Sequence, residues 1–325
     1  MLQATSKYKM VVNFVMNGIN DGSLSKGSWL PSINEFRGMF NLSRDTVFAG
    51  MSELKSKGVI ESYPGKGYYV CTSRLNVDHN ILLLFNEMNS FKQRLYNSLT
   101  NELGAGDNVD IQFHNYNRKV FETLLREANG KYDTFVLMPG KFQNIEELLN
   151  SLNGRVLLLD HFDNELRGKF SSVAQNFEDD TYNALVFGEE TLSRYTSYIM
   201  IQSETKEPYE RYYGMKRFCK ERGLKHKYLD HVSIKRIKEG DLYLVANDTD
   251  MVDLLKLAAT QNFTPGREFG LISYNDTPLK EILAGGITTL STDFSLMGKT
   301  MSKLIGKREI EVVENPWKLA IRAST

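Results

Sequence analysis

The chain has 325 residues, and at roughly 100–200 residues per domain this length predicts two or three domains. A hydrophobic share of 41% and an aromatic share of 11% are enough to form a sizeable core, which excludes disorder throughout the chain. Two cysteines, Cys71 and Cys219, are too few for a disulfide framework and favour a reducing compartment. We find no apolar run typical of a secretory signal or membrane helix, and expect a cytoplasmic protein without a membrane partner.

The formal net charge is zero, from 40 basic and 40 acidic residues, whereas DNA-binding domains usually carry an excess of positive charge. The charge is unevenly distributed along the chain. Residues 1–72 contain eight basic and five acidic side chains, and the remainder contains 32 basic and 35 acidic ones. Because a basic segment and an acidic remainder cancel, the neutral total does not exclude DNA as a partner.

Residues 1–72 have the pattern of three helices and a hairpin. Apolar residues recur at helical spacing between Tyr8 and Ile19, and a Ser32–Glu35 capping box begins a second helix that ends near Phe40. Ser43 begins a third helix, which Lys57-Gly58 ends. Two short strands, Val59–Tyr63 and Tyr68–Cys71, follow and are joined by a glycine-rich turn. This order predicts a winged helix-turn-helix, although each signal alone is also typical of an ordinary cap or turn.

The same segment resembles the DNA-binding domain of the GntR family. The motifs that carry the resemblance are Leu30-Pro31-Ser32, Leu42-Ser43-Arg44-Asp45-Thr46-Val47, Gly58-Val59-Ile60 and Gly65-Lys66-Gly67-Tyr68-Tyr69-Val70. The resemblance implies that DNA is contacted from the second and third helices and from the wing, by Ser32, Asn34, Ser43, Arg44, Thr46, Lys66 and Gly67. The family often has basic residues at the positions of Asn34, Phe48 and Ala49. With fewer phosphate contacts we expect weak binding by a monomer, and therefore a homodimer on a double-stranded operator.

From residue 79 onward, strands alternate with amphipathic helices. The expected strands are 81–85, 109–114, 134–138, 156–160, 172–176, 198–201, 242–246, 269–273 and 288–290, and the expected helices are 90–103, 118–129, 143–152, 178–195, 209–222, 249–261 and 294–305. This alternation predicts an α/β domain with parallel, doubly wound sheets, and its length favours two sheets in two lobes. We see no glycine-rich phosphate loop, which argues against an NTPase or a dinucleotide enzyme.

Polar residues follow many of these strands, at the edge where ligands of open α/β sheets bind. They are Asn86-Glu87, His114-Asn115, Asp160-His161, Asn247-Asp248 and Asn275-Asp276. Carboxylates, amides and a guanidinium such as Arg211 form bidentate hydrogen bonds with sugar hydroxyls. Aromatic faces such as Phe91, Phe162 and Phe294 could stack on a pyranose. Each of these polar residues could equally cap the next helix, but the set as a whole favours a polar ligand cleft.

This part of the chain resembles the LacI-type, periplasmic-binding-protein-like effector domain. The motifs are Asp160 after three leucines, Arg211-Tyr212-Tyr213-Gly214, Val245-Ala246-Asn247-Asp248, Gly270–Asp276, Thr288–Phe294, Met297-Gly298 and Ile321–Thr325. The resemblance implies a ligand pocket lined by Asp160, Arg211, Asn247, Asn275 and Phe294, to which the aromatic argument adds Phe91. Asn275 stands where the family commonly has Asp.

A GntR-type domain (residues 1–72), a linker (73–78) and a LacI-type domain (79–325) form the architecture of arabinose-repressor-type regulators. The chain also resembles fucose-responsive regulators of Bacteroidota. The resemblance implies a repressor of a carbohydrate-utilisation operon, responding to a monosaccharide, with L-fucose or L-arabinose favoured. Alternatives are a purine or other metabolite as effector, a sugar-processing enzyme, and a sugar transport receptor. We predict no catalytic residues, no metal site and no cofactor, because the five histidines lack ligand spacing and no nucleophile accompanies Asp160-His161.

Overall fold

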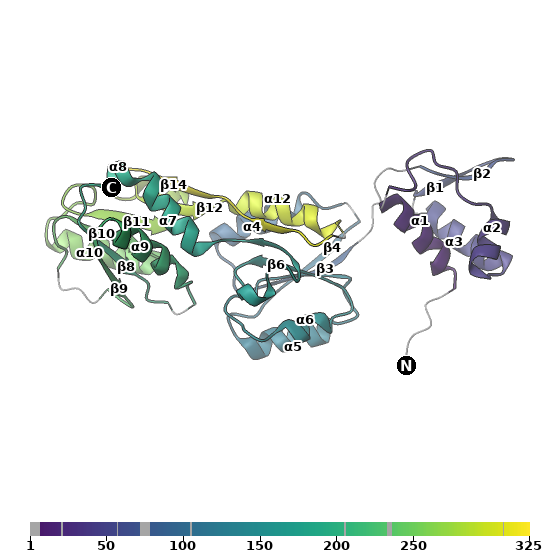
Figure 1. Ribbon diagram of the computed structural model, residues 1–325, viewed down its shortest axis with the longest axis horizontal. Helices are drawn as coiled ribbons and strands as arrows, with labels where there is room; N and C mark the ends of the chain where they lie inside the picture. Colours follow the sequence, from purple (N-terminus) through teal and green to yellow (C-terminus); the bar gives the residue numbers. More distant parts are fainter. Residues whose placement is uncertain are drawn as a thin grey trace. The chain divides into compact units, whose positions relative to one another are not determined.

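The structure is a computed structural model that describes residues 7–20, 22–56, 58–71, 79–104, 106–204, 206–232, 236–307 and 309–325 (Figure 1). The chain contacts define two compact units, which divide between Asp78 and His79, with residues 104–106 grouped with the first. The predicted linker, 73–78, lies outside the described residues.

The amino-terminal domain contains three helices and a two-stranded hairpin. They are α1 (Lys9–Asn20), α2 (Ile33–Phe40), α3 (Arg44–Ser56), β1 (Ile60–Tyr63) and β2 (Gly67–Val70). The Ser32–Glu35 capping box is present, and Asn41 ends α2 in the left-handed conformation. Val47, Met51 and Leu54 are fully buried, so one face of α3 lies in the core and its other face is exposed. The predicted winged helix-turn-helix is confirmed.

The carboxyl-terminal domain has two lobes, and the first, the N-lobe, is built on a parallel sheet with strand order β13-β7-β6-β5-β3-β4. Its strands are β3 (Asn80–Phe85), β4 (Asn108–Phe113), β5 (Thr134–Leu137), β6 (Arg155–Asp160), β7 (Ser171–Ala174) and β13 (Val312–Glu314). Helices α4 (Ser90–Thr100) and α12 (Phe294–Ile305) pack side by side on one face, while α5 (Arg118–Ala128) and α6 (Glu146–Asn150) cover the other (Figure 1). A short 3-10 helix, η1 (Asn164–Leu166), follows β6.

The second lobe, the C-lobe, has the strand order β14-β12-β11-β10-β8-β9. Its strands are β8 (Ser197–Ile201), β9 (Lys225–Leu229), β10 (Asp241–Val245), β11 (Gly270–Tyr274), β12 (Thr288–Thr292) and β14 (Trp317–Ala320). Helices α7 (Phe177–Phe187) and α9 (Glu210–Glu221) pack on one face and α10 (Asp248–Thr260) packs on the other. The short helices α8 (Glu189–Leu192), α11 (Pro278–Ile282) and η2 (Leu283–Gly285) complete the lobe.

The predicted α/β domain with two doubly wound sheets is confirmed, with differences in detail. The C-lobe sheet is mixed, because β14 runs antiparallel to β12. The prediction missed β9, β13, β14 and α11, which are short or rich in charged residues. The helix predicted over 178–195 breaks at Gly188, where an added Cβ would lie 2.9 Å from Leu319 Cδ2.

Three chain segments cross between the lobes, after β7, after β12 and between β13 and β14. Asn315 links all three through hydrogen bonds. Its backbone N–H donates to Ala174 O at 2.8 Å, and its buried amide donates to Thr292 Oγ1 at 2.6 Å and to Asp293 O at 2.9 Å. The lobes therefore share one hydrogen-bonded hinge, and the cleft between them lies beside it.

Candidate functional site

A cleft between the two lobes contains most of the residues predicted to bind a ligand. We call it the inner cleft, and it is lined by Asn86, Glu87, Phe91, Lys92, Tyr116, Gly140, Asp160, His161, Gln175, Phe177, Lys206, Glu207, Pro208, Arg211, Asn275 and Phe294. Many of these residues directly follow a strand of one of the two sheets. The carboxyl ends of the strands therefore supply the lining, as the rule for open α/β sheets predicts.

The charged side chains of the inner cleft are balanced. Three acids, Glu87, Asp160 and Glu207, face three bases, Lys92, Lys206 and Arg211. Lys206 Nζ lies 2.9 Å from Glu87 Oε2, and Arg211 donates to Glu207. Lys92 is buried and donates to Asn86 Oδ1. Burial lowers the pKa of Lys92, and the nearby Asp160 carboxylate opposes that shift.

Arg211 is held between aromatic rings, with its guanidinium 4.3 Å from the ring centroid of Tyr274 and 5.1 Å from that of Phe177. Its Nε is buried without a hydrogen-bond partner among the described residues. Because a buried charged donor without an acceptor is costly, a bound ligand that supplied an oxygen here would gain affinity.

Phe91 and Phe294 stack on each other, with ring centroids 4.9 Å apart and planes inclined by 30°. Phe294 begins α12 and is largely buried in the N-lobe core, whereas Phe91 is half-buried on α4. The pair therefore presents one apolar wall to the cleft, and the two rings do not form the opposite sides of a slot.

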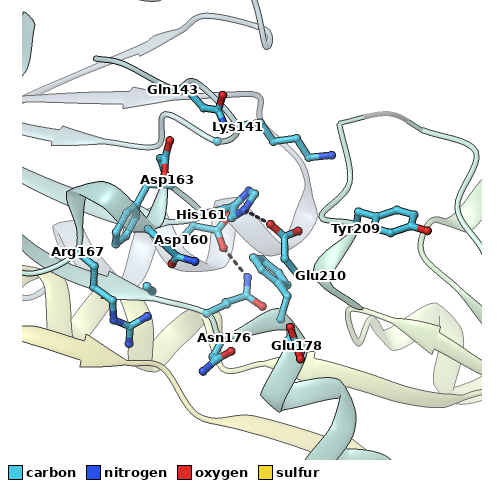
Figure 2. Close-up of a pocket in the computed structure, with 16 residues that line it drawn as sticks. Lys141, Gln143, Asp160, His161, Asp163, Arg167, Asn176, Glu178, Tyr209 and Glu210 are labelled. Atoms are coloured by element: carbon cyan, nitrogen blue, oxygen red, sulfur yellow. Dashed lines mark hydrogen bonds and ion pairs between the residues drawn. The ribbon is translucent and has the colours of Figure 1, made fainter. Parts of the chain in front are cut away.

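A second hollow, the outer pocket, adjoins the inner cleft and encloses about 410 Å³ (Figure 2). The two share Gly140, Asp160, His161, Gln175 and Phe177. Figure 2 shows His161 of the N-lobe directed toward Glu210 of the C-lobe, and their Nε2 and Oε1 atoms are 3.7 Å apart. The neighbouring His161 imidazole lowers the pKa of Glu210 to about 2.

Asp160 lies where the two hollows meet. Its backbone has the left-handed conformation, with φ of 71°, and its Oδ1 accepts a hydrogen bond of 2.5 Å from Gln175 Nε2. Asn275 has φ of 62°. Asp160 ends β6 and Asn275 directly follows β11, and both side chains line the cleft.

Five of the six predicted ligand residues, Phe91, Asp160, Arg211, Asn275 and Phe294, line the inner cleft. Asn247 lies outside the lining of both hollows. Its side chain caps α10, accepting from the Asp250 N–H at 2.8 Å and donating to Asp250 Oδ2 at 2.7 Å. His114 is fully buried, its Nε2 2.9 Å from Met138 O, and desolvation lowers its pKa. Both residues have structural roles, the reading that the sequence left open for each strand-end residue.

Sequence reasoning missed four charged or amide residues of the cleft. Gln175 was placed inside a strand that ends one residue before it, and Lys206 and Glu207 follow β8 after a short loop. With the correct end of β7 the strand-end rule would have found Gln175, whereas Lys206 and Glu207 lie five and six residues beyond the correctly predicted end of β8. Lys92 lies within α4, and nothing in its sequence context distinguishes it from a surface lysine.

In the amino-terminal domain, the predicted DNA-contacting residues lie on α2, on α3 and at the hairpin turn. Ser43 Oγ lies 2.7 Å from Thr46 Oγ1 and accepts from the Thr46 N–H, so these two residues also cap α3. Arg44 is exposed at the start of α3. At the turn, Gly67 has φ of 111°, and Lys66 Nζ lies 5.5 Å from the centroid of the Tyr63 ring. Ser32 and Asn34 are exposed at the start of α2.

Residues 7–70 match the family model described as bacterial regulatory proteins, gntR family. The amino-terminal domain is a GntR-type DNA-binding domain. It is also 36% identical, over 64 residues, to YdfD of Bacillus subtilis, described as an uncharacterized HTH-type transcriptional regulator. That match covers 20% of this chain and 13% of YdfD, so the chain spans only a small part of this curated relative.

The carboxyl-terminal domain is similar to solved structures of LacI-type proteins. One is a periplasmic binding protein/LacI transcriptional regulator from Alkaliphilus metalliredigens complexed with D-xylulofuranose, with TM-score 0.61, 13% identity and coverage of 76% of this chain and 99% of that one. A second is a LacI family regulator from Enterococcus faecium with bound ribose, with TM-score 0.61, 16% identity and coverage of 76% of this chain and 98% of that one. A third is a LacI family regulator from Bifidobacterium animalis subsp. lactis, with TM-score 0.65, 16% identity and coverage of 76% of this chain and 97% of that one. At this identity the likeness establishes the fold.

The expected order of folds is thereby confirmed: a domain that matches the gntR family model precedes a domain with the periplasmic-binding-protein-like fold of the LacI-type structures. The family model that matches the amino-terminal domain agrees with the expectation of a DNA-binding transcription regulator. Across the described residues, no helix has the length and apolar character needed to cross a bilayer. Within the same residues, no three His, Cys, Asp or Glu side chains are grouped so that they could hold a metal ion.

Proposed function

We propose that this chain is a transcription regulator, acting as a repressor of a carbohydrate-utilisation operon, whose operator binding is modulated by a monosaccharide held between the lobes. The GntR-type domain supports DNA as one partner, and the interlobe cleft supports a small ligand as the other. The proposal requires neither a metal nor a cofactor.

The observation that favours a neutral ligand is the equal number of acidic and basic side chains that line the inner cleft. Glu87 lies 2.9 Å from Lys206 and 4.0 Å from Lys92, Glu207 is paired with Arg211, and Lys92 also lies near Asp160. Lys206 pairs in addition, at 2.8 Å, with Glu204, which is not part of the lining. A charged ligand would leave one charge of this low-dielectric site uncompensated, which is costly. A neutral molecule with several hydroxyls can accept from Arg211 Nε and Lys92 and donate to Asp160.

The aromatic residues favour a sugar over a purine. A purine is bound best between two parallel rings, but Phe91 and Phe294 are 4.9 Å apart and already stacked on each other. A sugar needs only one apolar wall, which this pair provides. A purine effector would require the two rings to separate, or Tyr116 or Phe177, the other aromatic residues of the lining, to face them across the ligand.

L-fucose and L-arabinose are the sugars we favour, on the resemblance of the whole architecture to regulators that respond to them. The bound ligands named for two structural relatives, D-xylulofuranose and ribose, are also small neutral sugars. The place we propose for the ring is beside Asp160, where the inner cleft and the outer pocket meet.

We further propose that the regulator is a homodimer. Leu279 and Ile282 on α11 are 62% and 75% exposed, an apolar surface that a second copy of the C-lobe could cover. Closure of the lobes around the sugar would then change the spacing of the two DNA-binding domains, and thereby the affinity for the operator.

A thermal-shift screen of monosaccharides and purines tests the ligand class. A ligand that binds only the folded protein raises Tm by mass action, and at 100 times Kd the stabilisation is about 2.7 kcal/mol. We expect a pentose or a 6-deoxyhexose to raise Tm and to change operator affinity in a gel-shift titration. A shift with purines and none with sugars would overturn the sugar proposal while leaving the regulator intact.

A further inference from the structure

The exposed face of the recognition helix α3 has an unusual composition for a surface that meets DNA. Its exposed side chains are Arg44, Asp45, Phe48, Ala49, Ser52 and Lys55. Lys55 donates to Ser62 Oγ at 2.8 Å, so it is tied to the wing. The central part of this face is therefore apolar and uncharged, and phosphate binding does not explain it.

Phe48 is the largest side chain on this face and is 50% exposed. Single exposed apolar residues are common on protein surfaces, so exposure alone does not indicate a binding role for Phe48. The position of Phe48 on α3 points to a role in DNA recognition, because Phe48 lies four residues after Arg44 and shares its helix face. In a helix-turn-helix domain, the residues near the start of the recognition helix meet base edges in the major groove. A phenyl ring has no hydrogen-bonding group with which to bind a purine edge or a phosphate.

We propose that Phe48 recognises the C5-methyl group of a thymine in each operator half-site. This inference rests on the proposed DNA-binding function. The thymine methyl is the apolar group that the major groove presents, and contact with Phe or Ala side chains is a way proteins read it. Ala49 adds a small neighbour beside the ring without blocking it. Arg44, one turn earlier, reads an adjacent base pair through hydrogen bonds.

The test removes only the methyl group. The full chain is first used to select a consensus from a random pool of double-stranded DNA, and each thymine of a half-site is then replaced by deoxyuridine, which keeps the base pair. We expect one thymine per half-site whose replacement weakens binding about fourfold, the value expected for one buried methyl group. Phe48→Ala should abolish this sensitivity, so that thymine and deoxyuridine sites bind equally, and Phe48→Leu should retain part of it.

Met10→Ala is the matched control, because Met10 is exposed to a similar extent, 44%, but lies on α1. It should keep the full sensitivity to deoxyuridine. Failure to select any DNA sequence would overturn the proposed function itself. A clear consensus with no deoxyuridine-sensitive thymine, or sensitivity that survives in Phe48→Ala, would overturn the inference alone. If Phe48→Ala does not fold, Phe48→Leu takes its place, and full deoxyuridine sensitivity in Phe48→Leu would contradict the inference. A change of oligomeric state in either variant with unchanged base preference would contradict it as well.

Discussion

Lys206 of the C-lobe forms an ion pair with Glu87 of the N-lobe, at 2.9 Å across the inner cleft. Three other contacts join the lobes at the same edge. Lys141 donates to Glu207 O, Arg94 donates to Asp276 O at 2.6 Å, and His161 lies 3.7 Å from Glu210. The lobes therefore contact each other across the cleft, and in the proposed mechanism these contacts stabilise the closed form.

Replacing Lys206 should weaken closure. In Lys206→Ala, Glu87 loses its partner from the C-lobe and keeps only Lys92 and Asn89 of its own lobe. We expect sugar affinity to fall about two- to fivefold, because partly exposed ion pairs contribute on the order of 0.5–1 kcal/mol. Isothermal titration calorimetry with the sugar found in the screen measures this. Lys256→Ala, which removes an exposed pair with Asp253 on α10, is the control and should leave affinity unchanged. Equal affinities of Lys206→Ala and wild type would show that the pair does not hold the closed form.

Asp160 should be essential for the response to the effector. Asp160→Asn keeps a residue that tolerates the left-handed backbone but removes the negative charge. Since hydrogen bonds to a charged group contribute about 1.5–3 kcal/mol, we expect sugar affinity to fall at least tenfold. Operator binding without sugar should stay as in wild type. The two titrations are calorimetry with sugar and a gel shift with operator, and an unchanged sugar response would refute the placement of the ligand beside Asp160.

Arg44→Ala should weaken operator binding at least about fivefold, because each well-placed base contact discriminates by about 1–3 kcal/mol. Sugar affinity should not change, since Arg44 belongs to the amino-terminal domain. Arg126→Ala removes an exposed guanidinium from α5 of the N-lobe and controls for loss of charge alone. If sugar affinity fell in parallel with operator affinity, the assignment of DNA binding to the amino-terminal domain and of sugar binding to the carboxyl-terminal domain would be wrong.

Much of the amino-terminal domain could be predicted because its signals are local. The Ser32–Glu35 box, the buried residues of α3 and the glycines of the turn each specify structure within a few residues. The strand-end rule correctly predicted that Asp160 and Asn275 lie at the edge of the sheets that faces the cleft, and their role in ligand binding stays a prediction. The rule also selected Asn247, which caps α10 and does not line the inner cleft. A residue after a strand can line a cleft or cap a helix with the same side chain, and the rule does not distinguish the two.

Contacts between distant parts of the chain could not be predicted from the sequence. Glu87 and Lys206 are paired across the cleft, although 119 residues separate them. The three hinge segments that Asn315 joins come from different parts of the chain as well. Such pairings depend on how the two sheets meet, which periodicity and composition do not encode.

Asp180, on α7 close to the hinge, should make stability depend on pH. Burial raises the pKa of Asp180 to about 7, whereas an unfolded aspartate has a pKa of 3.8. A carboxyl whose folded pKa is raised contributes stability that is fully present below the unfolded value and is lost as pH rises through about 7.

Asp180→Asn removes this dependence of stability on pH. Its Tm should therefore exceed that of wild type by a few degrees at pH 8, and the difference should shrink toward pH 4. Differential scanning calorimetry across this range measures it, with Asp253→Asn on the exposed side of α10 as the control. A difference between Asp180→Asn and wild type that does not change with pH would mean that Asp180 is ionised in the folded protein at neutral pH, and that the Asn176 N–H bonded to its Oδ2 offsets the cost of burial.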